Sequence, residues 1–295
     1  AEWNVSICTK TGVQSTRASV IIDATGDANV VSLAGYDVVR PDTEQPATLQ
    51  FHCSGYDVDT LDYAALKHAS EQAIARGELK TTDLSWYDSG PESLLRNHGN
   101  NANHVVSHAA HTSDGRTQVE IEARRALVRA YRFFREQPGL ENFRIDWMCS
   151  EVGIRETVTI NGKRTMTIDE YESGVMYDDA VCYAFYPVDE HLNEGRGINQ
   201  RPLEHGVLPT IPRGAMLPAQ SNAIIVAGRC IASDRETNSA IRVQCPAMAT
   251  GQAAGAMAAL SVKTGVDPEA LPLEDIYELL REHGAIIPVS YTHLT

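Results

Sequence analysis

Several features are scarce or absent in this chain of 295 residues, and each absence excludes a class of protein. The six cysteines lie far apart and form no C-x-x-C pair, so the sequence has neither a redox dithiol nor a zinc clamp. Scattered cysteines are typical of a reducing compartment, and we expect a cytoplasmic protein. The one long run of small and apolar residues, 246–262, is shorter than the roughly 20 residues of a bilayer-spanning helix. We expect no transmembrane helix.

Positive charge and aromatic side chains are also scarce. Lys and Arg together number 25 against 39 Asp and Glu, which is a formal net charge of -14. Nucleic acids and anionic membranes repel a chain of this charge, so neither is an expected partner. Aromatic residues make up 6% of the chain, too few for a sugar-stacking platform. A small-molecule substrate remains the expected partner, and a homo-oligomer stays open.

The sequence also lacks a G-x-G-x-x-G turn, the element that holds the pyrophosphate of a dinucleotide in Rossmann-type domains. A nicotinamide-only dehydrogenase would need this turn, so that function has no support. The first residues, AEWNVSICTK, contain no initiator Met and run directly into strand-like alternation. We therefore expect the chain to begin inside a domain. We expect the tail VSYTHLT (289–295) to be a truncation point or foreign sequence.

The chain divides into regions with two kinds of sequence pattern. Residues 1–40 and 206–288 alternate apolar strands with helical patterns, which is typical of an α/β nucleotide-binding domain. Residues 41–205 resemble a separate α+β substrate domain inserted into it. The elements expected in the outer parts are a hairpin turning at Thr11-Gly12, strands Val20–Ile22 and Ala223–Ala227, a helix from Pro246, and a last helix from Leu273 to His283.

The clearest element of 41–205 is a long helix. Its apolar residues recur at helical spacing between Val119 and Phe134, and Thr117-x-x-Glu120 predicts a capping box at its start. TLQFHCSG is strand-like, and a helix is expected after Asp59. The segment 157–168, TVTINGKRTMTI, predicts a hairpin, because Asn161-Gly162 can supply the positive φ values of a type I′ turn.

Two apolar strands end in glycine, in VIIDATGD (20–27) and AIIVAGR (223–229). Ligands of open α/β sheets bind beyond the carboxyl ends of the strands, where Gly lets the backbone approach a bulky cofactor. The helix that follows has a smooth face made of Ala247, Gly251, Gly255 and Ala259. We expect a group to pack closely on this face and the start of the helix to face an anion. A tightly packed core helix would also explain the smooth face.

These segments, with GIRET (153–157), YPVDEH (186–191) and IPRGAMLP (211–218), resemble the FAD-dependent oxidoreductases. These are bacterial flavoproteins of the glutathione-reductase-like class with two dinucleotide-binding domains. The resemblance runs in order from about Val20 to Pro268, and VAGRC…IRV…GQAAG is its most specific part. It implies a Rossmann-like sheet across which FAD lies extended. Without a G-x-G-x-x-G turn, that FAD-binding domain is expected to be incomplete and to lack its N-terminal βαβ unit.

The resemblance implies three groups of FAD-binding residues. Those at the nucleotide end of the cofactor are Ala24, Thr25 and Gly26. Those near the pyrophosphate and ribityl chain are Gly228 and Arg229. Those that face the isoalloxazine ring are Arg242, Val243, Met248 and Gly251, at the start of the 246–262 helix. There, N–H groups would stabilise negative charge on the reduced flavin.

Four residues are candidates for acid–base or substrate roles: His104, Arg155, Glu156 and Glu236. Each has a simpler interpretation: a polar loop histidine for His104, a surface ion pair for Arg155 and Glu156, and a solvated side chain for Glu236. His104 and His108 are four residues apart, but no H-E-x-x-H pattern completes a metal site. Relatives often carry His at the positions of Arg235 and Asn238, so no catalytic histidine carries over from that loop.

Two functions from different classes follow. The first is an FAD-dependent oxidoreductase that takes a hydride from a small organic substrate, with a His or carboxylate of the inserted domain removing the coupled proton. The second is a truncated flavoprotein fragment, or a non-catalytic binding or structural module. Whether the chain retains FAD separates the two.

Overall fold

The structure is a computed structural model that describes residues 2–84, 90–106, 109–192 and 197–288. The chain forms two compact units, each with its own hydrophobic core. The first contains residues 1–41, 158–189 and 201–295, and the second contains residues 42–157 and 190–200. Of residues 41–205, for which an inserted domain is expected, residue 41 and residues 158–189 and 201–205 belong to the first unit. The expected foreign tail, 289–295, lies outside the described residues.

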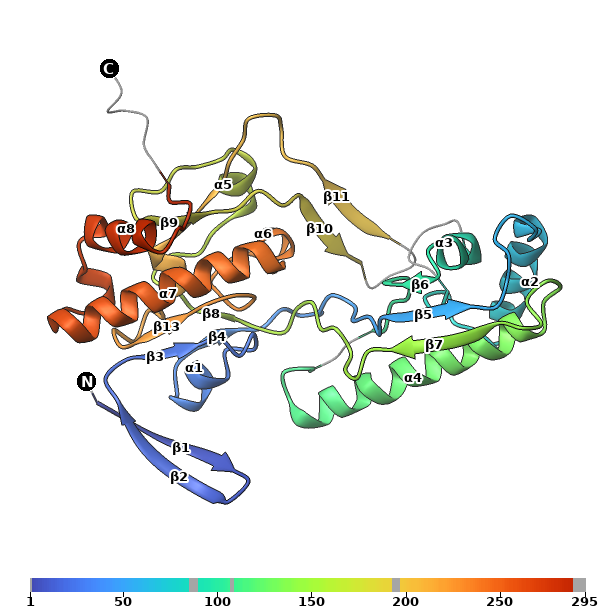
Figure 1. Cartoon of the computed structure of the whole chain (residues 1–295), viewed down its shortest axis with the longest axis horizontal. Helices are drawn as coiled ribbons and strands as arrows, with labels where there is room; N and C mark the ends of the chain where they lie inside the picture. The colour runs from blue at the N-terminus through green and yellow to red at the C-terminus, as the bar shows by residue number, and fades with distance from the viewer. Residues whose placement is uncertain (1, 85–89, 107–108, 193–196, 289–295) are drawn as a thin grey trace. The chain divides into compact units, whose positions relative to one another are not determined.

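The first unit is built around two parallel strands that come from opposite ends of the sequence. Strand β3 (Ile21–Asp23) pairs with β13 (Ile224–Val226), in the register Ile21 to Ile224 and Asp23 to Val226. All of β13 is buried, as its apolar sequence predicts. Helix α7 (Gln244–Thr264) packs against both strands (Figure 1). The two strands that were expected to end in glycine are thus neighbours.

The remaining elements of the first unit surround this pair. Strands β1 (Trp3–Thr9) and β2 (Gly12–Ala18) form the expected hairpin, which Figure 1 shows extending from β3. Helix α8 (Leu273–Glu282) ends near Gly284, as predicted. The other elements are α1 (Asn29–Leu33), β4 (Val38–Val39), β8 (Thr159–Ile160), α5 (Ile168–Glu172), β9 (Ala180–Tyr183), β12 (Thr210–Pro212) and α6 (Arg235–Ile241). Strands β10 (Val188–His191) and β11 (Ile198–Arg201) pair with each other, and their residues within 190–200 belong to the second unit.

The hairpin predicted for residues 157–168 is wrong. Strand β8 pairs with β4, through Ile160 and Val38, and not with the residues that follow it. Gly162 has no positive φ and forms a bridge with Pro218. A Cβ atom at Gly162 would lie 2.5 Å from the Cβ of Ala232, so close packing, and not a tight turn, requires glycine there.

The second unit has a three-stranded antiparallel sheet in the order β6 (Gly99–Asn100), β5 (Phe51–Ser54), β7 (Arg144–Met148). Its helices are α2 (Tyr63–Ala75), α3 (Pro91–Arg96) and α4 (Ser113–Arg135). Helix α4 buries the face predicted from its spacing, including Val119, Ala123 and Phe134, in the core of this unit. The strand at 51–54 and the helix after Asp59 are also confirmed.

The capping box predicted at Thr117 is wrong, because α4 begins one turn earlier. Thr112 is the N-cap residue, and its hydroxyl accepts a hydrogen bond from Gly115 N at 3.0 Å. The Thr117 hydroxyl donates to the Ser113 carbonyl at 2.8 Å, inside the helix. Ser, Thr and Asp occur at several positions in this stretch, and pattern alone does not decide which of them caps the helix.

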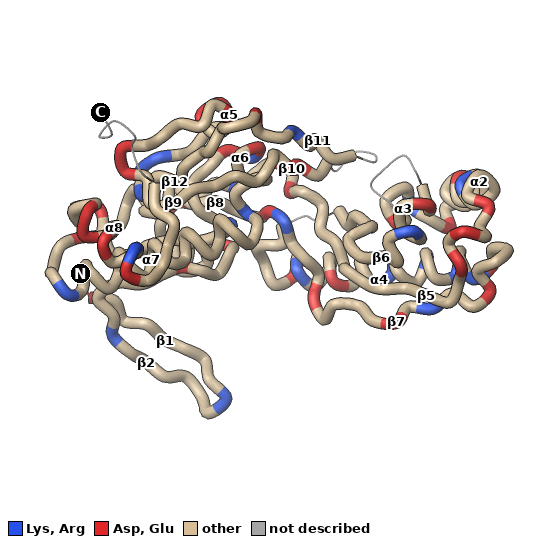
Figure 2. Tube along the Cα trace, turned by 45° about the horizontal axis from the view of Figure 1, so that its top comes forward, with Lys and Arg blue, Asp and Glu red and all other residues tan. Residues whose placement is uncertain are grey.

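Charged residues of both signs are spread over the elements of each unit (Figure 2). Within the described part of the chain, no helix is both long and apolar enough to cross a bilayer.

Candidate functional site

The glycines that end β3 and β13 lie at the same edge of the parallel pair. Gly26 has φ 76° and Gly228 has φ 81°, values that side-chain-bearing residues rarely adopt. Residues 24–26 and 228–229 therefore form two adjacent backbone turns, which we call the strand-end cradle. The structure thus brings together five of the residues expected to bind a nucleotide cofactor.

Asp23 fixes the first of these turns. Its fully buried carboxylate accepts hydrogen bonds from Thr25 N at 3.1 Å, Thr25 Oγ1 at 2.7 Å, Val30 N at 2.9 Å and Val31 N at 3.1 Å. Two of these donors are backbone N–H groups in α1, so one carboxylate joins β3, the turn and the helix. Sequence reasoning missed this residue, although a single carboxylate at the end of an apolar strand is a signal that could have identified it.

Arg229 joins the two turns. Its Nε donates to the Gly26 carbonyl at 2.8 Å, and its guanidinium forms an ion pair with Asp27. A Cβ atom on Gly26 would lie 3.2 Å from this guanidinium, which is closer than ordinary packing allows. The arginine expected near the pyrophosphate thus links the two backbone turns of the strand-end cradle.

Helix α7 approaches the cradle through its second turn. The Thr250 hydroxyl accepts a hydrogen bond from Gly228 N at 3.0 Å, and a Cβ on Gly228 would lie 3.8 Å from the Ala247 Cβ. Further along the small-residue face, a Cβ atom added to Gly251 or Gly255 would have no described atom within 4 Å. The close packing expected on this face is therefore absent beyond Ala247 in the described part of the chain.

The start of α7 differs from the predicted one. The helix begins at Gln244, so Pro246 is its third residue and not its first. Proline fits there because N–H groups of the first turn have no acceptor within the helix. The N-cap residue Val243 makes no side-chain cap. Arg242 donates through Nη2 to the Asp189 carbonyl at 3.0 Å, which anchors the residue before the cap.

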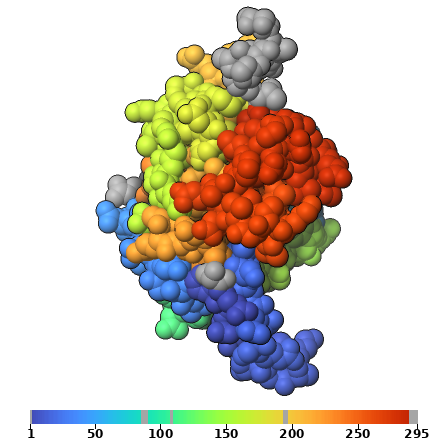
Figure 3. Space-filling view, turned by 90° about the vertical axis from the view of Figure 1, so that its left-hand side faces the viewer, coloured from blue at the N-terminus to red at the C-terminus, as the bar shows by residue number. Residues whose placement is uncertain are grey.

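Met248 lies on another side of α7. It lines an apolar cavity of about 930 Å³ with Cys245 and Gln252 of the same helix and with residues of β9 and α8. Figure 3 shows α7 and α8, in orange and red, at the surface of the first unit. No charged residue is among the described residues that line this cavity. Met248, one of the residues expected at the isoalloxazine ring, therefore does not lie on the face of α7 that contacts Gly228.

In the second unit, His104 is part of a buried histidine pair. Its Nε2 lies 2.7 Å from Nδ1 of His191, and the side chains are 1% and 2% exposed. The His191 backbone N–H donates to Oε1 of Gln45 at 3.1 Å. His104 lies in a loop, as its simpler interpretation has it, but its ring is in the interior. His108 lies outside the described residues.

Arg155 and Glu156 are also buried, so the surface ion pair is wrong. Arg155 Nη1 donates to the Pro46 carbonyl at 2.6 Å and to Thr48 Oγ1 at 2.8 Å, and its Nη2 donates to Asn101 at 3.0 Å. Glu156 accepts a hydrogen bond from Gln45 N at 2.8 Å. These contacts tie the segment 45–48 to its neighbours. Glu236, in the first unit, forms a half-exposed ion pair with Arg201 at 2.8 Å.

We expect Arg155→Met to lower the free energy of unfolding of the second unit by about 2–3 kcal/mol, because the buried acceptors at Pro46 and Thr48 lose a charged donor. Urea unfolding, followed by the fluorescence of a protein that lacks Trp3, measures this. Arg125→Met, an exposed change on α4, is the matched control, with an expected effect below about 0.5 kcal/mol. Unchanged stability with lost activity would favour a catalytic role for Arg155.

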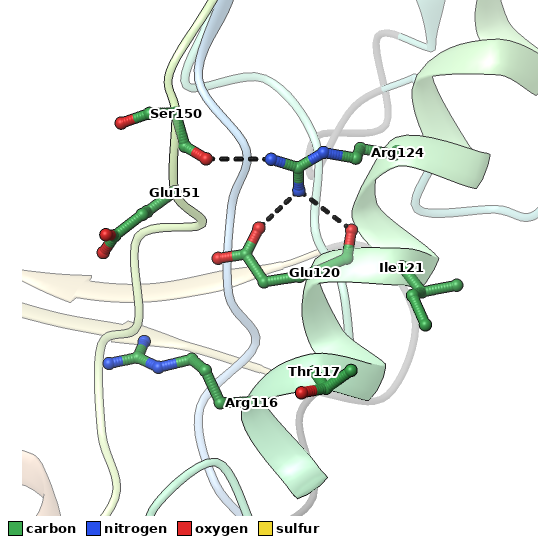
Figure 4. Close-up of a pocket in the computed structure, with 7 residues that line it drawn as sticks. All are labelled: Arg116, Thr117, Glu120, Ile121, Arg124, Ser150 and Glu151. Atoms are coloured by element: carbon green, nitrogen blue, oxygen red, sulfur yellow. Dashed lines mark hydrogen bonds and ion pairs between the residues drawn. The ribbon is translucent and has the colours of Figure 1, made fainter. Parts of the chain in front are cut away.

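A second cavity, of about 530 Å³, lies between the start of α4 and the segment after β7 (Figure 4). Arg124 on its wall donates to the Ser150 carbonyl at 2.8 Å and pairs with Glu120, which in turn accepts from Val152 N at 2.8 Å. These polar groups fasten the segment to the helix. None of the predicted site residues lines this cavity.

All six cysteines are free thiols, and three of them are buried. Burial raises the pKa of Cys182 to about 12 and, with the nearby Asp23 carboxylate, that of Cys230 to about 12. Neither thiol forms an appreciable amount of thiolate at neutral pH, so both act as small apolar core residues.

A family model described as FAD dependent oxidoreductase matches residues 2–281, nearly the whole chain. The chain matches no curated protein and no solved structure.

Proposed function

Because the chain belongs to the FAD dependent oxidoreductase family, its cofactor is FAD, and we propose that it passes a hydride from a small organic substrate to the flavin. The observation that carries this proposal is the strand-end cradle. Two parallel strands end in glycines with positive φ, joined by Arg229, at the edge where α/β sheets bind nucleotides.

The cradle residues fit a dinucleotide. Ala24 and Thr25 are exposed, and the backbone at Gly26 and Gly228 carries no side chain that would keep a ligand away. On α7, the backbone at Gly251 is equally open. Because Val243 provides no side-chain cap, the first N–H groups of α7 are suited to negative charge. In this proposal, residues 24–26, 228–229 and 242–243 and Gly251 hold FAD.

The proton that accompanies hydride transfer needs an acceptor, and we assign it to His104. Bound FAD supplies the hydride acceptor. The hydrogen bond between His104 and His191 holds one proton between two rings, so the pair can take up a second proton and share the charge. Arg155 and Glu156 position the segment that carries Gln45, next to His191. In the same proposal Glu236, which pairs with Arg201 at 2.8 Å, orients the substrate.

The test of flavin binding is the visible spectrum of the purified chain after incubation with FAD and desalting. We expect a retained flavin spectrum, and we expect Gly228→Ala to weaken FAD binding by about tenfold because its methyl group would lie where the cradle meets Ala247 of α7. Gly206→Ala is the matched control. Gly206 also has positive φ and is exposed, so both variants carry the same backbone strain, of about 1 kcal/mol.

A wild-type chain that retains no flavin would instead favour the alternative, a fragment or non-catalytic module of the family. Equal FAD affinity in the two glycine variants would show that the cofactor is held somewhere other than the strand-end cradle.

A further inference from the structure

The apolar cavity of about 930 Å³ that Met248 lines has no part in the proposed binding of FAD. None of the residues proposed to hold FAD is among the described residues that line it. Its volume falls within the range of roughly 300–1,000 Å³ that small-molecule sites have. All of its lining residues belong to the first unit, so the cavity forms within one compact body.

Hydrogen bonds and packing hold the walls of this cavity in place. Tyr277 of α8 donates to the Ala180 carbonyl of β9 at 2.6 Å, which joins two of the walls. After α8, Gly284 has φ 74° and turns the chain, and Ala285 N donates to the Leu280 carbonyl at 2.9 Å. Helix α7 packs against both β9 and α8 (Figure 1). The cavity is therefore preformed, as small-molecule sites usually are.

Large apolar side chains at the cavity remain in contact with solvent. Four of those that line it are more than half exposed: Phe185 at 61%, Leu208 at 54%, Met248 at 74% and Ile286 at 82%. Apolar surface that faces water costs free energy, and such side chains gathered around a cavity are typical of binding sites. This arrangement gives Met248 a role other than the flavin contact that the family resemblance implies.

The chemistry of the lining decides which ligands the cavity suits. No charged side chain is among the described lining residues, in a chain of which 22% of the residues are charged. A carboxylate or an amine would therefore lose its water without gaining a partner of opposite charge. Tyr183 and Gln252 supply neutral hydrogen-bonding groups. The cavity thus suits an uncharged, mostly apolar molecule with few polar groups.

A second copy of the chain fits this surface less well. Two copies, each with a formal net charge of -14, repel each other, and no basic side chain among the described lining residues would offset that repulsion. An uncharged small molecule is not subject to it.

We propose that this cavity is a binding site for a neutral, apolar small molecule, of the class of aromatic compounds and medium-length alcohols. The site is separate from the strand-end cradle, so the inference does not depend on the proposed function.

The test uses the uncharged fluorescent probe N-phenyl-1-naphthylamine and two competitors, 1-octanol and octanoate. The competitors have alkyl chains of similar length, and only octanoate is charged. We expect one probe to bind per chain, and we expect octanol to displace it at a concentration at least about tenfold lower than octanoate does. Fluorescence titration measures both effects.

Cys245 reports occupancy of the cavity directly. Its thiol is exposed and lines the cavity, whereas Cys8 is an exposed thiol of β1 and is not among the described lining residues. With saturating octanol, we expect iodoacetamide to alkylate Cys245 about tenfold more slowly and Cys8 at an unchanged rate, as measured by peptide mass spectrometry. Cys182 also lines the cavity but reacts slowly, because burial raises its pKa to about 12.

The variant Met248→Lys places a charge on the cavity wall. We expect it to bind the probe about fivefold more weakly, because apolar contact is lost and a charge is introduced. Val262→Lys is the matched control: Val262 is also an apolar residue of α7, 60% exposed, and is not among the described residues that line the cavity. We expect this control to bind the probe with wild-type affinity.

Three results would overturn the inference. The first is displacement by octanol and octanoate at equal concentrations, or equal probe affinity in the two lysine variants. The second is displacement of the probe by FAD, because the cavity would then belong to the flavin site. The third is a wild-type dimer in sedimentation that Met248→Lys dissociates, because the surface would then be an interface between copies. FAD retention without probe binding would overturn only this inference and leave the proposed function standing.

Discussion

Replacing Asp23 by Ala is expected to lower the free energy of unfolding of the first unit by about 3–5 kcal/mol. The carboxylate is fully buried and accepts hydrogen bonds from four donors, three of which are backbone N–H groups. Hydrogen bonds to charged groups are the stronger kind, and their loss leaves buried donors unpaired. The turn at residues 24–26 should also lose its shape, so FAD retention should fall with stability.

Urea unfolding of a protein whose only tryptophan is Trp3 measures this effect, since Trp3 packs edge to face on Tyr36 in the same unit. Asp37→Ala is the matched control: Asp37 is exposed, and we expect its replacement to change the unfolding free energy by less than about 0.5 kcal/mol. An Asp23→Ala protein as stable as this control would show that the carboxylate does not hold the first turn of the cradle.

Replacing His104 by Gln is expected to slow reduction of the bound flavin by about 10²–10⁴-fold once a reducing substrate is identified. Glutamine preserves a polar side chain next to His191 but takes up no proton. The rate of flavin bleaching in stopped-flow experiments measures the effect, and FAD retention by the variant should match that of the wild type. His191→Gln should give a smaller loss, because it removes only the residue that shares the charge.

His68→Gln is the matched control for this experiment, because His68 is an exposed histidine of the second unit, on α2. We expect its bleaching rate to equal that of the wild type. If His104→Gln also reduced the flavin at the wild-type rate, the proton acceptor would be another group, and the histidine pair would be a structural part of the interior.

Sequence patterns predicted the elements whose signals are local. The predicted strands Val20–Ile22 and Ala223–Ala227 overlap the observed β3 and β13, and the spacing of Val119, Ala123 and Phe134 identified the buried face of α4. Predictions of a helix cap and of a tight turn were wrong where more than one residue, or more than one structure, fits the same local pattern. Thr112 caps α4 although Thr117 fits the capping-box pattern, and Asn161-Gly162 forms no tight turn because β8 pairs with β4.

The sequence by itself determined the mixed α/β class, the family and hence the cofactor, because each depends on residue types in order along the chain. Only the tertiary structure decided which distant residues meet. Asp27 pairs with Arg229 and His104 with His191, since pairing across such separations depends on how strands and helices pack. Burial was decided in the same way. Arg155, a candidate site residue whose simpler interpretation was a surface ion pair, is an interior donor. The hydroxyl of Thr237 has no hydrogen-bond partner among the described residues, because the packing around α6 encloses it.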